Sequence, residues 1–172
     1  MGKYCIGVDI GGTTVKIGLF TDKGNVKDKW EIVTRKDEGG SFILSDIAAS
    51  VDEKLAQEKI TKKDVLGIGL GIPGPITADG TVLKCVNLGW GIFNVAEEVK
   101  KLTGIFNVKV GNDANVAALG EMWQGGGKGY KNLVMMTLGT GVGGGIIIGG
   151  EIVTGAHGAG GEIGQSQCGC PL

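Results

Sequence analysis

The sequence predicts an α/β protein with a mixed sheet, arranged as two lobes. The expected elements run in the order βββαβαβα and then ββ, and a meander followed by αβ units is typical of this fold class. The composition also changes near residue 113, because residues 1–113 carry 30 charged side chains and residues 114–172 carry only 5. We therefore expect one lobe over 1–113 and the beginning of a second lobe over 114–172.

The chain is expected to open with a three-stranded antiparallel meander. Residues 4–9 form a short apolar run typical of a buried strand. Residues 14–21 alternate apolar and polar side chains with the period of two that a strand requires. Residues 22–25, with the sequence Asp-Lys-Gly-Asn, predict a turn, and a third strand follows over 26–34.

The middle of the first lobe is expected to contain a helix and a buried strand. Residues 65–72 predict a strand, which ends at Pro73-Gly74-Pro75 because proline continues neither a strand nor a helix. A helix is expected before it, over 41–60, where apolar side chains recur every fourth residue on one face: Ile43, Ile47, Val51 and Leu55.

A second helix is expected to begin at Asn94-Val-Ala-Glu97, which has the pattern of a capping box, and to continue to about Leu102. Residues 108–111 predict a short strand, and residues 114–123 a helix that follows it directly. Asn112 or Asp113 is the expected N-cap of that helix, since both residue types accept hydrogen bonds from the first turn.

The second lobe is expected to begin with a β-hairpin. Three consecutive glycines, residues 125–127, end the preceding helix. Residues 132–138 and 142–148 then read as two strands around the turn Gly139-Thr140-Gly141. Residues 133–150 carry no charge, but seven of these 18 residues are glycine, which argues against a membrane-spanning helix.

Composition excludes several classes of protein. The net charge of −1 gives no sign of a nucleic-acid or acidic-lipid partner, so neither nucleic acid nor membrane is expected to bind. The chain has 35 glycines without a Gly-X-Y period, which excludes collagen. The start shows no basic and then apolar signal peptide, so we expect a cytoplasmic protein with free thiols.

The first candidate site is the segment of residues 9–16, Asp-Ile-Gly-Gly-Thr-Thr-Val-Lys, between two expected strands. Gly11 and Gly12 allow the backbone to approach an anion closely, because neither has a Cβ. Thr13 adds a hydroxyl donor and Lys16 a positive charge, while Asp9 is placed to hold a metal-bound water near phosphates. The spacing is not that of a P-loop. An ordinary Gly-Gly turn is the alternative interpretation.

The second candidate site is the segment of residues 138–145, Leu-Gly-Thr-Gly-Val-Gly-Gly-Gly. It repeats the pattern of the first, with the hydroxyl of Thr140 and the bare backbone of Gly141 and Gly143. Two such loops would bind one polyphosphate from two sides, with Mg²⁺ neutralising its charge. In the alternative interpretation these glycines only permit tight packing of the hairpin.

Two carboxylates and two thiols complete the candidates. Asp113 follows Asn112 where a strand ends and a helix begins, so it is either a simple N-cap or a base that accepts a proton from a substrate hydroxyl. Glu162 lies among glycines, either on a plain surface loop or in a site. Cys168 and Cys170 have metal-ligand chemistry, but a structural zinc site needs four ligands.

Taken together and in this order, these motifs resemble the ROK family of sugar kinases and repressors, within the actin–hexokinase–Hsp70 superfamily. Besides the segments quoted above, the resemblance rests on residues 71–75 (Gly-Ile-Pro-Gly-Pro), 87–90 (Asn-Leu-Gly-Trp), 111–115 (Gly-Asn-Asp-Ala-Asn) and 161–164 (Gly-Glu-Ile-Gly). It implies ribonuclease-H-like lobes of the actin type, of which the second is cut short after its beginning. The chain looks most like the N-terminal portion of a bacterial glucokinase of this family.

The resemblance also implies roles for individual residues. The activity is ATP-dependent phosphorylation of a hexose, most simply glucose to glucose 6-phosphate, with Mg²⁺ and with Asp113 as the catalytic base. The family places its hexose against Gly74, Asn87, Asn112, Asp113 and Glu162. The residues implied to bind ATP are Asp9, Gly11, Gly12, Thr13, Lys16, Thr140, Gly141 and Gly143.

Three features of this sequence depart from the family pattern. Gln165 stands where the family has histidine. Cys168 and Cys170 follow too closely and lack the remaining cysteine of the family's zinc motif, so they form at most half of a zinc site. Family members also continue for well over a hundred residues beyond Leu172. We therefore expect the chain to be inactive by itself, and the family's preference for dimers leaves a homodimer open.

Two other interpretations remain at this point. ROK transcriptional repressors carry a winged-helix segment before the D-x-G-G-T motif, whereas that motif begins here at residue 9. A non-catalytic fragment that retains part of the fold is the third interpretation. The sequence alone does not fix which hexose is bound.

Overall fold

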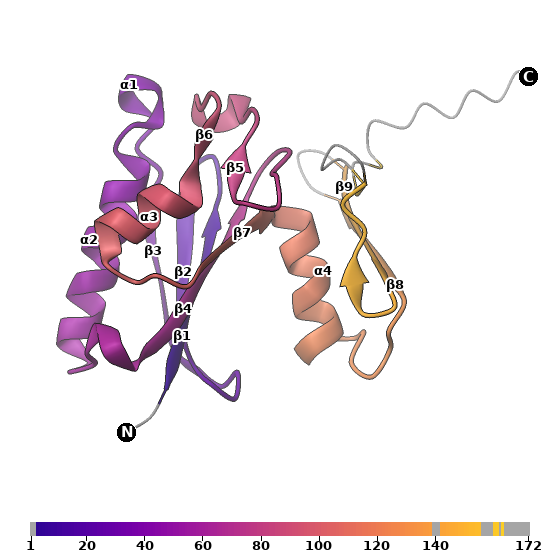
Figure 1. Cartoon of the computed structure of the whole chain (residues 1–172), viewed down its shortest axis with the longest axis horizontal. Coiled ribbons are helices and arrows are strands. Elements are labelled where there is room, and N and C mark those ends of the chain that lie inside the picture. Colours follow the sequence, from indigo (N-terminus) through magenta and orange to yellow (C-terminus); the bar gives the residue numbers. More distant parts are fainter. Residues whose placement is uncertain (1–2, 139–141, 156–159, 162, 164–172) are drawn as a thin grey trace, which may run out of the picture. The chain divides into compact units, whose positions relative to one another are not determined.

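The structure is a computed structural model, and it describes residues 3–138, 142–155, 160–161 and 163. The chain divides into two compact units, Met1–Asp113 and Ala114–Leu172 (Figure 1). Each unit has its own sheet. We describe the units one at a time, beginning with the first.

The first unit is built on a five-stranded mixed sheet in the order β3-β2-β1-β4-β7. The three N-terminal strands form the expected antiparallel meander, while β1 pairs in parallel with β4 and β4 with β7. The strands are β1 (Tyr4–Ile10), β2 (Thr14–Thr21), β3 (Val26–Val33), β4 (Val65–Ile72) and β7 (Val108–Asn112). The predicted α/β class with a mixed sheet is therefore confirmed.

Two helices, α2 (Ile43–Gln57) and α3 (Val95–Thr103), cover one face of this sheet (Figure 1). The apolar stripe predicted for α2 is buried, and it joins the inward side chains of β1, β2 and β4 in one core. The side chain of Asn94 accepts a hydrogen bond of 2.9 Å from the Glu97 amide, as the capping-box pattern predicted. Helix α3 then ends at Gly104, whose φ is 71°.

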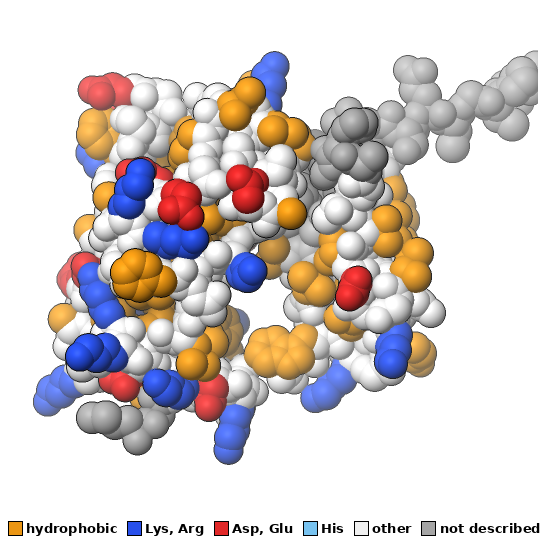
Figure 2. All heavy atoms as spheres, in the orientation of Figure 1, with side chains coloured by type: hydrophobic (Ala, Val, Ile, Leu, Met, Phe, Trp, Pro, Cys, Tyr) orange, Lys and Arg blue, Asp and Glu red, His pale blue; other side chains and the backbone are white. Residues whose placement is uncertain are grey.

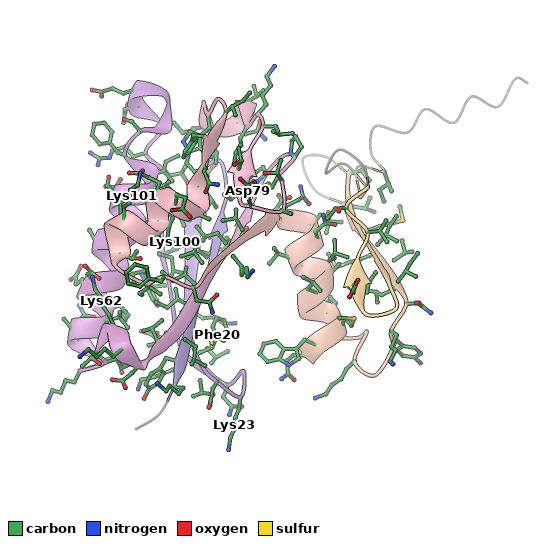
Figure 3. All side chains as sticks on the ribbon, in the orientation of Figure 1. Phe20, Lys23, Lys62, Asp79, Lys100 and Lys101 are labelled. Carbon is green, nitrogen blue, oxygen red and sulfur yellow. The ribbon has the colours of Figure 1, made fainter. Side chains whose placement is uncertain are left out.

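The opposite face of the sheet is lined largely by glycine. Gly7 on β1, Gly18 on β2 and Gly69 on β4 are neighbours in register. A Cβ on Gly18 would lie 2.6 Å from the ring of Phe20, and one on Gly7 would lie 3.3 Å from it, so this ring covers the two glycines (Figure 3). A Cβ on Gly69, by contrast, would meet no atom within 4 Å.

Several short elements were not predicted. Residues Asp37–Gly40 (α1) are assigned as a helix, but Glu38, Gly39 and Gly40 have positive φ, so this segment is a left-handed turn. The pair β5 (Thr81–Val82) and β6 (Phe93–Asn94) closes a loop between β4 and α3. The 3₁₀ turns are η1 (Lys62–Asp64) and η2 (Val86–Leu88).

Asp79 ties this β5–β6 loop to the start of α3 (Figure 3). Its carboxylate accepts hydrogen bonds from the hydroxyls of Thr77 and Thr81, and at 3.2 Å from the side chain of Asn94, the N-cap of α3. The Thr77 hydroxyl, followed by that of Thr81, lowers the pKa of Asp79 below its ordinary value. The ionised carboxylate therefore holds the loop and the helix cap together.

The second unit consists of α4 (Asp113–Gln124, beginning at the last residue of the first unit) and a three-stranded antiparallel sheet in the order β10-β9-β8. Its strands are β8 (Leu133–Leu138), β9 (Val142–Ile148) and β10 (Glu151–Ile152), so the predicted hairpin is confirmed. Gly145 lets β9 pack directly on α4, because its Cβ would lie 2.5 Å from the Cβ of Ala118.

One face of this small sheet is apolar and solvent-exposed, and hydrophobic side chains gather there (Figure 2). The exposed fractions of Val134, Met136 and Leu138 on β8 are 65%, 62% and 80%. Alternate residues of β8 share a face, so these three side chains form one exposed stripe.

Charged side chains of both signs are interspersed over the surface of the first unit (Figure 2). Many are paired locally, for example Lys54 with Asp28 at 2.7 Å and Arg35 with Asp46 at 2.7 Å. Exposed pairs of this kind contribute about 0–1 kcal/mol each. In the part of the chain that the structure describes, no helix combines the length and hydrophobicity that a membrane crossing requires.

Candidate active site

Most candidate residues of the first unit, though not Asn87, lie at the end of its sheet where β1, β4 and β7 finish. In the strand register, Asp9 of β1 lies between Lys16 of β2 and Gly71 of β4, and Gly71 pairs in turn with Gly111 of β7. The parallel strands β1, β4 and β7 all end just beyond this row. Open α/β sheets bind their ligands outside the carboxyl ends of such strands.

The hairpin between β1 and β2 is held by the end of β3. The amide of Gly11 donates to the Thr14 carbonyl at 3.0 Å, which closes the turn. Thr34, which is buried, donates its hydroxyl to the Gly11 carbonyl at 2.7 Å and its amide to the Thr13 carbonyl at 2.9 Å. Both hydrogen bonds therefore hold carbonyl groups of the hairpin backbone against the end of β3.

The two glycines of this hairpin differ in what surrounds them. A Cβ on Gly11 would lie 2.8 Å from the Thr14 carbonyl oxygen, so the tight turn requires glycine there. A Cβ on Gly12 would meet nothing within 4 Å, so that position opens to solvent beside the exposed Thr13. An open backbone next to a hydroxyl donor suits the oxygen atoms of a phosphate.

Asp9 lies on the exposed surface of β1. The pKa of its carboxyl is raised, chiefly because neighbouring protein displaces part of its hydration. Lys16 lowers the pKa in opposition, and the negative charge of Asp113 raises it. Asp9 and Asp113 are therefore close enough to interact electrostatically, and a cation bound near Asp9 would relieve their repulsion.

The loop that follows β4 is fixed by a left-handed glycine and by Asn112. Gly74 has a φ of 104°, and its Cβ would lie 2.7 Å from the Lys84 carbonyl oxygen. The buried side chain of Asn112 donates to the Gly74 carbonyl at 3.3 Å. This bond links the end of β7 to the loop after β4.

Asp113 and Asn115 lie at the start of α4. The structure places Asn112 as the last residue of β7 and the half-buried Asp113 as the first residue of the helix. A carboxylate in the first turn interacts favourably with the helix dipole, so this position is compatible with both interpretations of Asp113. Asn115 is buried, and a Cβ on Gly161 would lie 3.0 Å from its Oδ1. Sequence reasoning gave Asn115 no role.

Asn87 lies in a separate loop that the sequence did not resolve. It is an exposed residue of η2, and the loop is closed by two hydrogen bonds of 3.0 Å between the backbones of Cys85 and Trp90. Burial raises the pKa of the Cys85 thiol, which belongs to the hydrophobic core. Cys5, by contrast, is only partly buried.

Of the three residues of the second unit that are predicted to bind the nucleotide, Gly143 lies among the described residues. Its Cβ would lie 2.7 Å from the hydroxyl oxygen of Thr137 and 3.3 Å from the Cβ of Ala114, so glycine at this position permits close packing. Five predicted site residues lie outside the described residues: Thr140, Gly141, Glu162, Cys168 and Cys170.

The described residues contain no cluster of three or more His, Cys, Asp or Glu side chains that could hold a metal ion. Mg²⁺ does not require such a cluster, since it commonly binds through one or two carboxylates together with substrate phosphates and water. Asp9, beside the Gly11–Thr13 hairpin, fits that mode of binding. Cys168 and Cys170, predicted to form at most half of a zinc site, lie outside the described residues.

The fold and this arrangement of residues define an α/β protein with a glycine-rich hairpin between β1 and β2 and a carboxylate near the end of β1. A family model described as "ROK family" matches residues 5–171. The chain therefore belongs to the ROK family.

Comparison with individual proteins agrees with this assignment. The chain is 48% identical over 164 residues to a glucokinase of Halalkalibacterium halodurans, covering 95% of this chain and 49% of that protein. It is 34% identical to a putative xylose repressor of a Caldicellulosiruptor species, covering 93% of this chain and 40% of the repressor. The chain thus spans about half the length of the curated glucokinases it matches.

Among solved structures, the chain is similar to a ROK family glucokinase from Streptomyces griseus in complex with glucose and AMPPNP. The TM-score is 0.82 and the identity 35%, over 96% of this chain and 51% of that one. The fold therefore resembles the N-terminal lobe of ROK proteins.

Proposed function

We propose that this chain provides the nucleotide hairpin and the catalytic base of an ATP-dependent hexose kinase of the glucokinase type. The observation that carries the proposal is the strand register, which sets Asp9 and Lys16 in one row with the ends of β4 and β7. The 48% identity to a glucokinase supports it independently. The reaction is the conversion of glucose and ATP to glucose 6-phosphate and ADP.

Asp9, Gly11, Gly12, Thr13 and Lys16 are proposed to hold the nucleotide's phosphates. Gly12 leaves room for an oxygen atom at the backbone, and Thr13 presents an exposed hydroxyl beside it. Bound ATP supplies the phosphoryl group, and Mg²⁺ neutralises its charge. Asp9 would hold the hydrated Mg²⁺, which favours the ionised carboxylate against the desolvation that raises its pKa.

Asp113 is proposed as the general base. The carboxylate accepts the proton of the hexose 6-hydroxyl while the oxygen bonds to the terminal phosphorus and the bond to the leaving ADP breaks. A positioned base contributes about 10²–10⁴-fold to rate. Asp113 directly follows β7, whose pairing with β4 fixes the backbone on that side.

The hexose is proposed to contact Gly74, Asn87 and Asn112, together with Glu162. The hydrogen bond from Asn112 to the Gly74 carbonyl keeps the loop after β4 at a fixed distance from the base. The proposal further assigns Thr140, Gly141 and Gly143 to the nucleotide and Cys168 and Cys170 to an incomplete zinc pair.

The compact units Met1–Asp113 and Ala114–Leu172 are proposed to be the first lobe and the beginning of the second. We also propose that the reaction takes place in the cytoplasm. Whether the chain forms a homodimer is a question for a measurement of its mass in solution. Because the chain spans about half of its glucokinase relatives, the test joins it to the half of such a relative that it does not match.

The test is a chimera in which this chain is followed by the second half of the Halalkalibacterium halodurans glucokinase. We expect glucose-dependent release of ADP, measured with a coupled assay, and little turnover by the chain alone. A folded chimera that binds glucose and nucleotide but releases no ADP would refute the kinase assignment.

A sugar-responsive repressor is the second candidate, because a putative xylose repressor is 34% identical over most of this chain. The same assay separates the two functions. A repressor-type domain would bind a sugar without consuming ATP, whereas a kinase consumes one ATP for each hexose that it phosphorylates.

A further inference from the structure

The connection between β3 and α2, residues 34–42, contacts both loops to which we assign substrates. We call this segment the brace. Its first residue, Thr34, contacts the nucleotide hairpin, and Gly40 contacts the loop of residues 85–90 that carries Asn87. Sequence analysis gave the brace no role.

Thr34 fixes one end of the brace through two hydrogen bonds. Its hydroxyl donates to the Gly11 carbonyl at 2.7 Å, and its amide donates to the Thr13 carbonyl at 2.9 Å. Only 6% of Thr34 is exposed, so solvent has little access to replace these bonds. A shift of Thr34 therefore shifts the backbone on both sides of Gly12.

Gly40 fixes the other end. The indole Nε1 of the buried Trp90 donates to the Gly40 carbonyl at 3.0 Å. Gly40 has a φ of 74°, and any Cβ there would collide with the Leu88 carbonyl oxygen. Gly89 faces the brace with a φ of 77°, and its Cβ would lie 3.1 Å from the Cα of Gly39. The turn at Gly39 and Gly40 therefore packs against the turn at Gly89 so closely that a side chain at Gly40 would collide with the facing backbone.

The brace is also held internally and against α2. Arg35 binds the carboxylate of Asp46 with two hydrogen bonds of 3.0 Å and 2.7 Å, and its guanidinium lies 4.1 Å from the centre of the Phe42 ring. The Gly40 amide donates to the Lys36 carbonyl at 3.1 Å. A bidentate pair with a stacked ring is more rigid than a single exposed ion pair.

We propose that the brace couples the nucleotide hairpin to the loop that carries Asn87, so that the two loops move as one body. The inference rests on the proposed function for the identity of the ligands, but the mechanical coupling is a property of the first unit itself. Ordering of one loop by its ligand would then reduce the conformational entropy lost when the other loop binds, which is positive cooperativity between nucleotide and hexose.

Hydrogen exchange of the unmodified chain and two variants tests the coupling. Thr34→Val removes the hydroxyl donor but keeps a β-branched side chain, and Trp90→Phe removes the indole donor but keeps an aromatic ring beside Phe93, which packs edge-on to Trp90 at 5.2 Å. In Thr34→Val we expect the Gly11 amide to exchange about fivefold faster, the factor that one net hydrogen bond contributes. The Gly40 amide and the Trp90 indole should also exchange faster, by about twofold or more.

Trp90→Phe should have the reciprocal effect, with faster exchange at Gly40, Gly11 and Thr34. Thr34→Ser should restore slow exchange at both ends. Thr103→Val is the matched control, because Thr103 is also buried, donates to the Val99 carbonyl at 2.7 Å and lies outside the brace. Its effect should be confined to the end of α3.

An increase confined to the hairpin in Thr34→Val, with Gly40 and Trp90 unchanged, would overturn the proposal. Circular dichroism of each variant establishes that it is folded, and Trp90→Phe tests the coupling from the other end of the brace if Thr34→Val unfolds. Calorimetric titration of the chimera with the second half of the Halalkalibacterium halodurans glucokinase, using glucose and a non-hydrolysable ATP analogue, tests the function separately. Coupled exchange without binding would contradict the proposed ligands but support the coupling through the brace. Binding without coupled exchange would support the proposed ligands and contradict the coupling.

Discussion

Replacing Gly74 by alanine tests how tightly the loop after β4 is held, and two other glycines of the first unit, Gly69 and Gly104, serve as references. Gly69 has an ordinary φ and open space at its Cβ position. Gly104 has a φ of 71° but also no atom within 4 Å of its Cβ position. Gly74 combines a φ of 104° with a Cβ position 2.7 Å from the Lys84 carbonyl oxygen. Alanine at position 69 therefore meets no constraint, and alanine at position 104 introduces backbone strain alone. Alanine at position 74 introduces both backbone strain and a clash.

The expected changes in unfolding free energy follow from these surroundings. Gly69→Ala should stabilise the chain by about 0.5–1 kcal/mol, since it restricts the unfolded chain and meets no obstacle. Gly104→Ala should cost about 1 kcal/mol for a left-handed alanine. Gly74→Ala adds about 1–3 kcal/mol of overpacking to a backbone cost of about 1 kcal/mol, about 2–4 kcal/mol in total. Its Tm should fall by about 10 °C.

Thermal and urea unfolding followed by circular dichroism would measure all three variants under one buffer condition. A glucose titration of Gly74→Ala in the chimera would show whether the displaced loop also weakens hexose binding, as the Asn112 bond predicts. The reasoning would be refuted if Gly74→Ala were no less stable than Gly104→Ala. Equal stability would mean that the loop moves aside at no cost and does not fix the hexose contacts.

Three further changes are expected to have measurable effects. Lys59→Gly should raise the unfolding free energy by about 1 kcal/mol in urea titrations, because Lys59 has a φ of 55° after the end of α2. Asn94→Ala should lower it by about 1 kcal/mol through loss of the α3 cap, with α3 amide exchange as the readout. Asp9→Asn should raise Tm at pH 7, because desolvation raises the Asp9 pKa and so favours the uncharged form in the folded state. That gain should shrink as the pH falls through the folded-state pKa and Asp9 itself becomes protonated; melting curves at several pH values would show it.

The strands and helices with strong local signals could be predicted from the sequence. Alternation identified β2, the apolar stripe identified α2, and Asn94 marked the start of α3 within a residue. The ends of α2 were placed two or three residues too far out, over 41–60. The left-handed turn at Gly40 precedes the start of α2, and the positive φ of Lys59 follows its end. No single sequence pattern predicts either conformation.

The candidate site was only partly predictable for a similar reason. Asp9 and the hairpin glycines stand out because glycine, threonine and lysine occur together between two strands. Thr34 and Trp90 form hydrogen bonds with residues more than twenty positions away in the sequence, and no local sequence pattern predicts such contacts. The row from Lys16 through Asp9 to Gly71 depends on strand order, which the sequence does not state.

The central claim is that Asp113 is the base of a hexose kinase, and the most direct measurement is the kcat of Asp113→Asn in the chimera with the second half of the Halalkalibacterium halodurans glucokinase. Asparagine keeps the size of the side chain and a hydrogen-bonding group at the start of α4, so folding and glucose affinity should change little. We predict that kcat falls by about 10²–10⁴-fold. A kcat within about threefold of the parent chimera would contradict the claim and leave Asp113 with a structural role at the helix start.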